Sequence, residues 1–189
     1  AWDLDLQSSA GQGERPETPH DMWMCYAGSD DGLHWRKPDL GLVEFRGSTD
    51  NNIMWRGVGE KQHGLKATAV FKDSNPDCSP EARYKAVGPD RRSIRGHLYA
   101  LGSPDGKHWS LLQDEPILKQ GEDGKFDSQN LAFWDEQEGH YRIYVRASGP
   151  NGRAIATATS NDFLNWTETQ LLEYPGAPGE QLYINQIRP

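Results

Sequence analysis

Three acidic residues occupy comparable places in the chain and have the chemistry of general acids and bases. Asp127 and Glu180 each open a short apolar stretch, and Asp50 lies in the polar segment Ser48–Asn52. Two carboxyl groups on either side of a reacting bond can give and take a proton, provided that burial or a neighbouring negative charge keeps one of them protonated. Asp127 and Glu180 are therefore the predicted catalytic pair, and Asp50 is a third candidate.

Each of these carboxylates also has a structural interpretation. Asp127 can be a turn residue that bonds the backbone beside Ser128. Glu180 can be a solvated loop residue after a Pro-Gly pair, and Asp50 can belong to an ordinary loop. The sequence leaves both interpretations open, so the elements that position these side chains decide between them.

The composition predicts a folded, loop-rich chain and excludes several classes of protein. Among 189 residues there are 20 Gly and 12 Pro, so turn-forming residues make up about 17%, against roughly 12% in average usage. The formal net charge of −8 argues against a surface for duplex DNA. No stretch approaches the roughly 20 apolar residues of a membrane span. Two cysteines, Cys25 and Cys78, leave one disulfide or two buried thiols open.

Ten short apolar or alternating stretches bounded by Gly, Pro, Asn and Asp predict an all-β fold. No helical period longer than two turns separates them, which argues against a parallel α/β fold with crossover helices. The predicted strands are Met22–Gly28, Leu42–Phe45, Ala67–Lys72, Tyr84–Val87, Leu98–Gly102, Leu131–Trp134, Tyr141–Ala147, Ala154–Thr159, Thr167–Tyr174 and Leu182–Ile187.

One motif occurs three times, each time between two predicted strands. It reads Ser-Asp-Asp-Gly-Leu-His-Trp at 29–35, recurs as Ser-Pro-Asp-Gly-Lys-His-Trp at 103–109, and recurs more loosely at 160–166. These residues predict a hairpin turn in which Ser and Asp bond the turn backbone, Gly adopts a positive φ and Trp covers the base. The histidines inside the motif, His34 and His108, are predicted to be structural.

The copies are 74 and 57 residues apart (103 − 29 and 160 − 103), and blades of four antiparallel strands in a β-propeller fit this spacing best. Blade portions are predicted at about 1–50, 51–120, 121–175 and 176–189 within a single domain, or about two and a half blades. A closed propeller needs at least four. The chain is therefore expected to be a fragment, which its abrupt ends favour, or to complete a ring by self-association.

Several segments, taken together with the hairpins, resemble the five-bladed β-propeller glycoside hydrolases of the superfamily that contains families 32 and 43. They are Lys37–Phe45 with Asn51–Ile53, Asn75–Cys78 with Arg83–Ala86, and Phe126–Asn130 with Phe133–Asp135. The resemblance runs from about Met22 to Pro189. It implies a five-bladed type of fold in which the innermost strand of each blade carries acidic residues into a central pocket.

The resemblance implies a glycosidase acting on plant or algal poly- or oligosaccharides, with inversion as in family 43. Such hydrolysis needs two carboxyl groups, about 5 to 5.5 Å apart for retention or roughly 6.5 to 9.5 Å apart for inversion. Glu180 would be the general acid, and Asp127 the base or the carboxylate that orients the substrate. Similar enzymes also take an essential Asp from a first blade, which this chain is not expected to contain.

Two other kinds of propeller compete with the glycosidase interpretation. A non-catalytic carbohydrate-binding or scaffolding propeller is the main alternative. A sialidase is disfavoured, because its Asp-box motif places one residue between Asp and Gly, whereas Asp31-Gly32 and Asp105-Gly106 are adjacent.

Further residues are candidates for binding the sugar. Amides could hydrogen-bond its hydroxyl groups, aromatic rings could stack on its faces, and guanidinium groups could bind a carboxylated or sulfated sugar. Strand-edge amides, core packing and salt bridges are the structural interpretations of the same side chains. The candidates are Asn130, Asn185, Trp55, Trp134, Arg146, Arg188 and His63.

The six histidines lack metal-ligand spacing, so the sequence predicts no metal site and no cofactor, although a central calcium ion is an alternative. The expected partner is a carbohydrate, and neither a nucleic acid nor a membrane is expected. By the resemblance alone, the protein is expected to be secreted or periplasmic.

Overall fold

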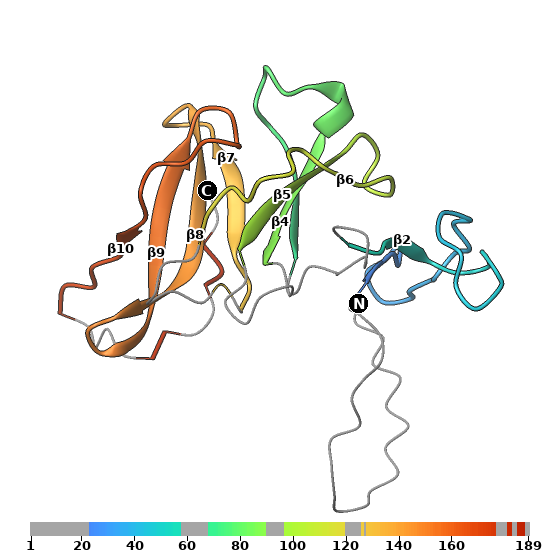
Figure 1. The fold of residues 1–189 in the computed structure, drawn as a ribbon, viewed down its shortest axis with the longest axis horizontal. Coiled ribbons are helices and arrows are strands. Elements are labelled where there is room, and N and C mark those ends of the chain that lie inside the picture. The colour runs from blue at the N-terminus through green and yellow to red at the C-terminus, as the bar shows by residue number, and fades with distance from the viewer. Residues whose placement is uncertain are drawn as a thin grey trace, which may run out of the picture. The chain divides into compact units, whose positions relative to one another are not determined.

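The computed structural model describes residues 23–57, 68–89, 97–119, 126, 128–176, 181–182 and 185–187 (Figure 1). The chain divides into two compact units, Ala1–Gly64 and Leu65–Pro189. Whether they make up a single domain stays a prediction. Within the described ranges, no helix is both long enough and apolar enough to cross a membrane.

The second unit contains two four-stranded antiparallel sheets whose strands follow one another in chain order. This meander is the arrangement of a propeller blade, and it confirms the predicted all-β class with four-stranded antiparallel sheets. The first sheet comprises β3 (Ala69–Lys72), β4 (Tyr84–Pro89), β5 (Leu98–Ser103) and β6 (Ser110–Leu111), with the short 3-10 helix η1 (Pro80–Ala82) before β4. The second sheet comprises β7 (Leu131–Asp135), β8 (His140–Gly149), β9 (Gly152–Ser160) and β10 (Gln170–Leu171).

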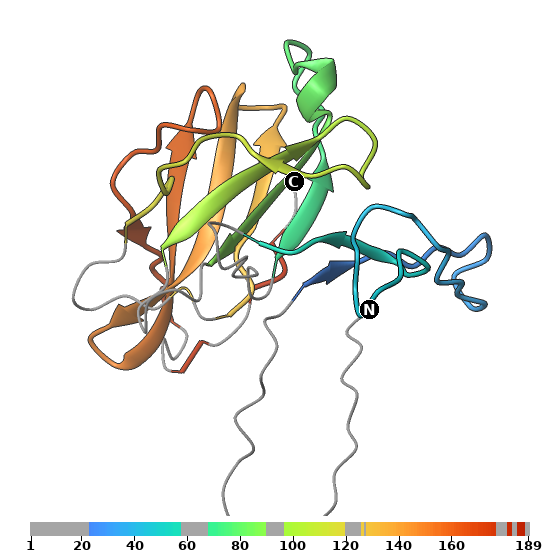
Figure 2. The ribbon, with the colours of Figure 1, turned by 45° about the vertical axis from the view of Figure 1, so that its right-hand side comes forward.

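Apolar residues from both sheets of this unit form one core (Figure 2). Alternation along β8 buries Tyr141, Ile143 and Val145 on one face, because successive side chains of a strand point to opposite faces. Val87 of β4 and Leu98 of β5 belong to the same cluster. The predicted strands thus meet through the faces that their alternation marks as apolar.

Each of the three hairpins is closed by the same bonds between side chains and its own backbone. In the second copy, Ser103 Oγ accepts hydrogen bonds from the amides of Asp105 and Gly106, at 3.3 and 2.8 Å. Asp105 Oδ1 accepts from the next two amides, both at 2.9 Å, and the Trp109 indole donates to the Gly106 carbonyl at 3.0 Å. The first and third copies repeat this set. The predicted turn chemistry is confirmed.

The fourth position of the turn adopts a left-handed conformation in all three copies. Gly32 and Gly106 have φ of 75° and 77°, and Phe163 has φ of 69°. A side chain in this conformation costs about 1–2 kcal/mol. Phe163 is fully buried and lies edge-on to the rings of Tyr141 and Trp166, with centroids 5.2 and 5.8 Å apart. Its packing offsets the backbone cost.

The described part of the first unit contains a two-stranded antiparallel sheet of β1 (Met24–Cys25) and β2 (Ile53–Trp55). The prediction of a strand at Leu42–Phe45 is wrong. Phe45 instead bridges to Ser48 across a tight turn in which Arg46 and Gly47 have φ of 51° and 87°. Two successive positive φ angles reverse the chain at once, so no strand extends there.

Two predicted strands near the end of the chain are shorter than expected or missing from the described residues. Of the stretch Thr167–Tyr174, only Gln170–Leu171 pairs, as β10. Within Leu182–Ile187, the described residues 182 and 185–187 are not in a strand. Leu182 still bonds the backbone of β9, where its amide donates to the Arg153 carbonyl at 3.0 Å.

The third hairpin predicts a dependence of stability on pH. Partial burial acts to raise the pKa of Asp162, but hydrogen bonds led by those of the Asn165 backbone and side chain outweigh it and lower the pKa to about 2. An unfolded aspartate titrates near about pH 3.9. The ionised carboxylate therefore stabilises the fold above about pH 4, and this stabilisation is lost as the pH falls towards 2.

We expect Asp162→Asn to lower the free energy of unfolding at neutral pH and to have a smaller effect near about pH 3, as measured by urea denaturation at both values. Asn161→Ala, at an exposed and uncharged position of the same turn, is the control, and its effect should not change with pH. An Asp162→Asn effect of equal size at both pH values would contradict the role given to the carboxylate.

Candidate functional site

Asn130 fixes the turn that leads into β7. Its side-chain nitrogen donates to the carbonyls of Phe126 and Ser128, at 3.3 and 2.9 Å. Its side-chain oxygen accepts a hydrogen bond from the backbone amide of Arg146 on β8, at 3.2 Å. Asn130 is fully buried. These bonds tie the start of β7 to β8, which is a structural role for this amide.

A segment late in the chain lies against the same end of the second sheet. The Arg153 guanidinium, just after the β8–β9 turn, donates to the Gln181 side chain at 3.4 Å. The Gln186 side chain donates to that of Gln129, just before β7, at 3.0 Å. The described parts of this segment therefore touch the sheet both at the β8–β9 turn and at the entry to β7.

Asn185 in this segment has a buried side chain whose polar atoms are not satisfied. It is 6% exposed, and neither its side-chain nitrogen nor its side-chain oxygen has a hydrogen-bond partner. A buried polar group without a partner costs about 1–3 kcal/mol, and native proteins leave few of them. Among the described residues, no other side chain has two such atoms. The amide of Asn185 is therefore the strongest indication of a ligand-binding group.

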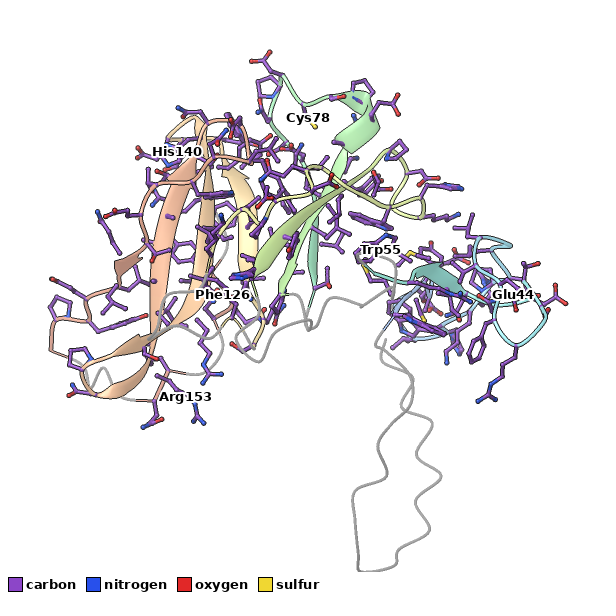
Figure 3. The ribbon with its side chains drawn as sticks, in the orientation of Figure 1. Glu44, Trp55, Cys78, Phe126, His140 and Arg153 are labelled. Carbon is purple, nitrogen blue, oxygen red and sulfur yellow. The ribbon has the colours of Figure 1, made fainter. Side chains whose placement is uncertain are left out.

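Three predicted binding residues thus meet at one end of the second sheet. Asn130 bonds the backbone of Arg146, and Gln186, the neighbour of Asn185, bonds Gln129, the neighbour of Asn130. Figure 3 shows Phe126 and Arg153 towards this end of the sheet and His140 at the other. We call the end formed by residues 128–130, Arg146 and residues 185–186 the amide end.

Four predicted residues lie outside the described residues, namely Asp127, Glu180, Arg188 and His63. The residues on either side of Asp127, Phe126 and Ser128, are buried. The catalytic roles of Asp127 and Glu180 and the binding roles of Arg188 and His63 stay predictions.

The candidates Asp50 and Trp55 belong to the first compact unit, whereas the amide end belongs to the second. Asp50 is exposed, and its amide donates to Ser48 Oγ at 2.9 Å, as in an ordinary loop. Trp55 is half-buried on β2, where it pairs with Met24.

Trp134, predicted to stack on a sugar or to pack in the core, is half-buried on β7. Its ring lies edge-on to that of Tyr141, with centroids 4.9 Å apart, and it packs against the buried core of the unit. In the described structure its role is core packing.

The described ranges contain no group of three or more His, Cys, Asp or Glu side chains that could hold a metal ion. Cys25 and Cys78 are both half-buried and are not joined in a disulfide. The central calcium ion stays a prediction.

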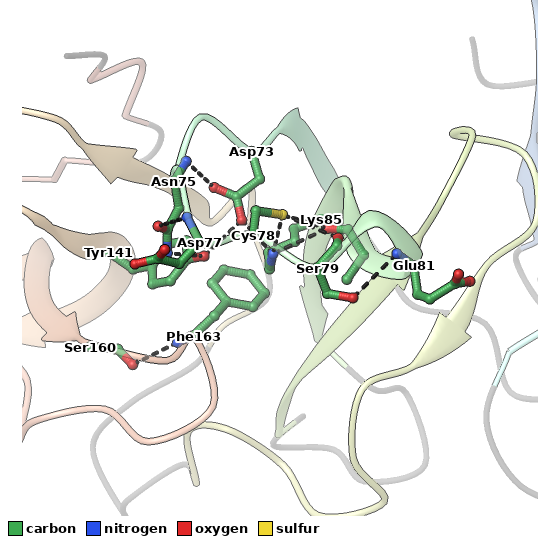
Figure 4. Close-up of polar contacts among 11 residues, drawn as sticks. Asp73, Asn75, Asp77, Cys78, Ser79, Glu81, Lys85, Tyr141, Ser160 and Phe163 are labelled. Atoms are coloured by element: carbon green, nitrogen blue, oxygen red, sulfur yellow. Dashed lines mark hydrogen bonds and ion pairs between the residues drawn. The ribbon is translucent and has the colours of Figure 1, made fainter.

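A buried ion pair joins the two sheets at the end away from the amide end (Figure 4). Lys85 on β4 pairs with Asp73, which follows β3, and both side chains are buried. The Tyr141 hydroxyl on β8 donates to Asp73 Oδ2 at 2.7 Å and accepts from the Asn75 side chain at 3.0 Å. Lys85 also donates to the Ala82 carbonyl at 3.1 Å. One carboxylate thus binds groups from both sheets.

The surroundings fix the protonation states in this cluster. Burial acts to raise the pKa of Asp73, but hydrogen bonds from Lys85, Asn75 and Tyr141 outweigh it and hold that pKa below its usual value. Burial and the Asp73 carboxylate raise the pKa of the Tyr141 hydroxyl and of the Cys78 thiol. Cys78 Sγ lies 3.3 Å from Lys85 Nζ. Because a thiolate, not a thiol, is the nucleophile, the contacts of Cys78 fit a structural role.

Sequence reasoning did not identify this cluster, although some of its residues belong to the segments that carry the resemblance. The available signal was a lysine within the otherwise apolar strand Tyr84–Val87. Lysine is almost never fully buried unless it is paired, so Lys85 required a buried anion.

Comparisons with known proteins give a distant likeness. No family model matches the chain, and no curated protein matches it either. Among solved structures, the chain is similar to one described as a complex of BT0996 and RGII, at 16% identity and a TM-score of 0.40. It is also similar to one described as "Glycoside hydrolase", at 18% identity and a TM-score of 0.40. Each similarity covers 85% of this chain and 49% of the other, so the chain spans about half the length of these structures.

The buried ion pair predicts a large effect of removing one partner. Lys85→Met leaves the Asp73 carboxylate buried without its cation, and we expect a loss of about 3–5 kcal/mol in the free energy of unfolding, measured with urea. Lys72→Met, at an exposed position of β3, should change it by less than about 0.5 kcal/mol. The double variant Asp73→Asn with Lys85→Met should recover part of the loss. Equal effects of the two single variants would show that the ion pair does not join the sheets.

Proposed function

We propose that this chain is a glycoside hydrolase-like domain that binds plant or algal poly- or oligosaccharides at the amide end and hydrolyses their glycosidic bonds. The observation that carries the proposal is the buried amide of Asn185, whose two polar atoms have no partner. Binding sites orient their ligands with a few well-placed polar groups, and an amide can both donate to and accept from a sugar hydroxyl.

The order of residues along the chain supports the assignment of Asp127 and Glu180 to this site. Asp127 stands between Phe126 and Ser128 in the sequence, and Glu180 directly precedes Gln181. Ser128 accepts the bond from Asn130, and Gln181 accepts the bond from Arg153. Both acids are therefore next in sequence to residues that are described at or beside the amide end.

In the proposed reaction Glu180 gives its proton to the leaving glycosidic oxygen. Asp127 takes a proton from the water that attacks the anomeric carbon from the opposite face, so the configuration inverts. The acid must hold its proton at neutral pH, which burial or a neighbouring carboxylate provides. A sugar as substrate, the absence of a cofactor and a secreted or periplasmic location belong to the same proposal.

The proposal predicts separate effects on hydrolysis and on binding. On a panel of plant and algal polysaccharides, Asp127→Asn and Glu180→Gln should each slow the release of reducing ends by about 10²- to 10⁴-fold while the chain still binds the polysaccharide. Asn185→Ala should weaken binding by up to about tenfold, the value of one hydrogen bond. The anomer released first, followed by NMR, reports inversion.

Glu136→Gln is the matched control, because Glu136 is an exposed acid in the β7–β8 turn, away from the amide end. It should affect neither hydrolysis nor binding. Binding without hydrolysis would refute the catalytic assignment in favour of a carbohydrate-binding propeller. Neither binding nor hydrolysis with any polysaccharide would refute the proposal as a whole.

A further inference from the structure

The second and third hairpins are each covered by a tyrosine from the preceding strand of their own sheet. Tyr84, the first residue of β4, pairs with Ser103, and a Cβ built at Gly106 would lie 3.7 Å from the Tyr84 ring. Tyr141 of β8 pairs with Ser160, and its ring contacts that of Phe163. In both sheets, an aromatic residue opposite the serine of the motif therefore packs against the turn.

The first hairpin has the same internal hydrogen bonds and a different environment. A Cβ built at Gly32 would meet nothing within 4 Å. Trp35 is 63% exposed, whereas its counterpart Trp109 is 8% exposed and Trp166 is half-buried. Leu33 is 80% exposed. The turn is complete, and what differs from the other copies is its apolar cover.

One edge of β1 carries the same pairings as β5 does. Gly28 exchanges hydrogen bonds with Arg36 at 2.9 and 2.8 Å, in the register that pairs Gly102 with Ser110. The Tyr26 amide donates along the same edge, because alternate residues of a strand point the same way. Ala27 points to the other edge, where no described strand lies, whereas β5 and β9 are paired at that edge with β4 and β8.

We propose that this second edge of β1 is the docking site for an extended segment of the same chain, Trp2–Leu6. Residues 1–22 lie outside the described residues, and their sequence supplies a segment with the required pattern. Trp2-Asp3-Leu4-Asp5-Leu6 alternates between apolar and polar residues, as a half-buried strand does. It has the order aromatic, charged, apolar that also begins Tyr84-Lys85-Ala86 and Tyr141-Arg142-Ile143.

The register follows from the other two sheets. Tyr84 opposes Ser103 and Tyr141 opposes Ser160, so Trp2 opposes Ser29. Antiparallel pairing then sets Leu4 opposite Ala27. Trp2 would cover the turn at Gly32, as Tyr84 covers it at Gly106, and residues 7–22 are long enough to return the chain to Trp23 in the antiparallel direction. This docking is independent of the proposed function.

Cross-linking tests the register directly. Directly opposed residues of an antiparallel pair have Cα atoms about 4.5–5.5 Å apart, within the range of a disulfide. The variant with Leu4→Cys and Ala27→Cys should form this link within one chain under mild oxidation. The matched control carries Asp5→Cys with Ala27→Cys, whose thiols point to opposite faces, and it should link at least about tenfold less. Peptide mapping separates these links from any that involve Cys25 or Cys78.

A second measurement needs no cysteine. Trp2→Glu should speed hydrogen exchange at the Ala27 amide by about tenfold or more, because the amide loses its cross-strand acceptor. Asp3→Asn, which keeps the apolar residues, should leave that rate unchanged. Equal linking in both cysteine variants, no linking in either, or an unchanged exchange rate in Trp2→Glu would overturn the proposal. A link between two chains would make a second copy the occupant and would overturn it as well.

Discussion

Asp73 lies between two sheets that would otherwise meet only through apolar side chains. Hydrophobic burial is not directional, so it holds the sheets together without fixing how one lies on the other. The bonds of Asp73 are directional, because one carboxylate binds an ammonium group on β4 and a hydroxyl on β8. Removing Lys85 alone would leave an uncompensated buried charge. The orientation of the two blades, and hence the arrangement of the amide end, depends on this carboxylate.

The two ends of the second sheet have different chemistry. At one end, the polar atoms of Asp73, Lys85 and Tyr141 bond one another, and burial together with the carboxylate keeps protons on Tyr141 and Cys78. At the other end, Asn130 is fully satisfied, while the neighbouring Asn185 retains two buried polar atoms without partners. A satisfied polar network stabilises a fold, whereas an unsatisfied one is suited to binding, because a ligand can provide the missing bonds.

Local chemistry explains what the sequence could predict. The strands of both blades and the three hairpins follow from alternation and turn residues, which act over a few positions. The strand expected at Leu42–Phe45 failed because the adjacent Arg46 and Gly47 form a turn. The Asp73 cluster joins residues 68 apart in sequence, and the contact of Gln186 with Gln129 joins residues 57 apart. No periodicity reports such pairings, and the roles of Asp127 and Glu180 remain predictions.

The left-handed phenylalanine of the third hairpin has a consequence for folding kinetics. In the first two hairpins glycine adopts the required φ without strain, so Ser, Asp and Trp can close the turn from local bonds alone, on the microsecond scale of an isolated hairpin. Phe163 pays for the same conformation with contacts to Tyr141 and to Phe71 of the other sheet. That turn therefore becomes stable only as the two sheets meet, which ties closure of the last hairpin to the collapse of the core.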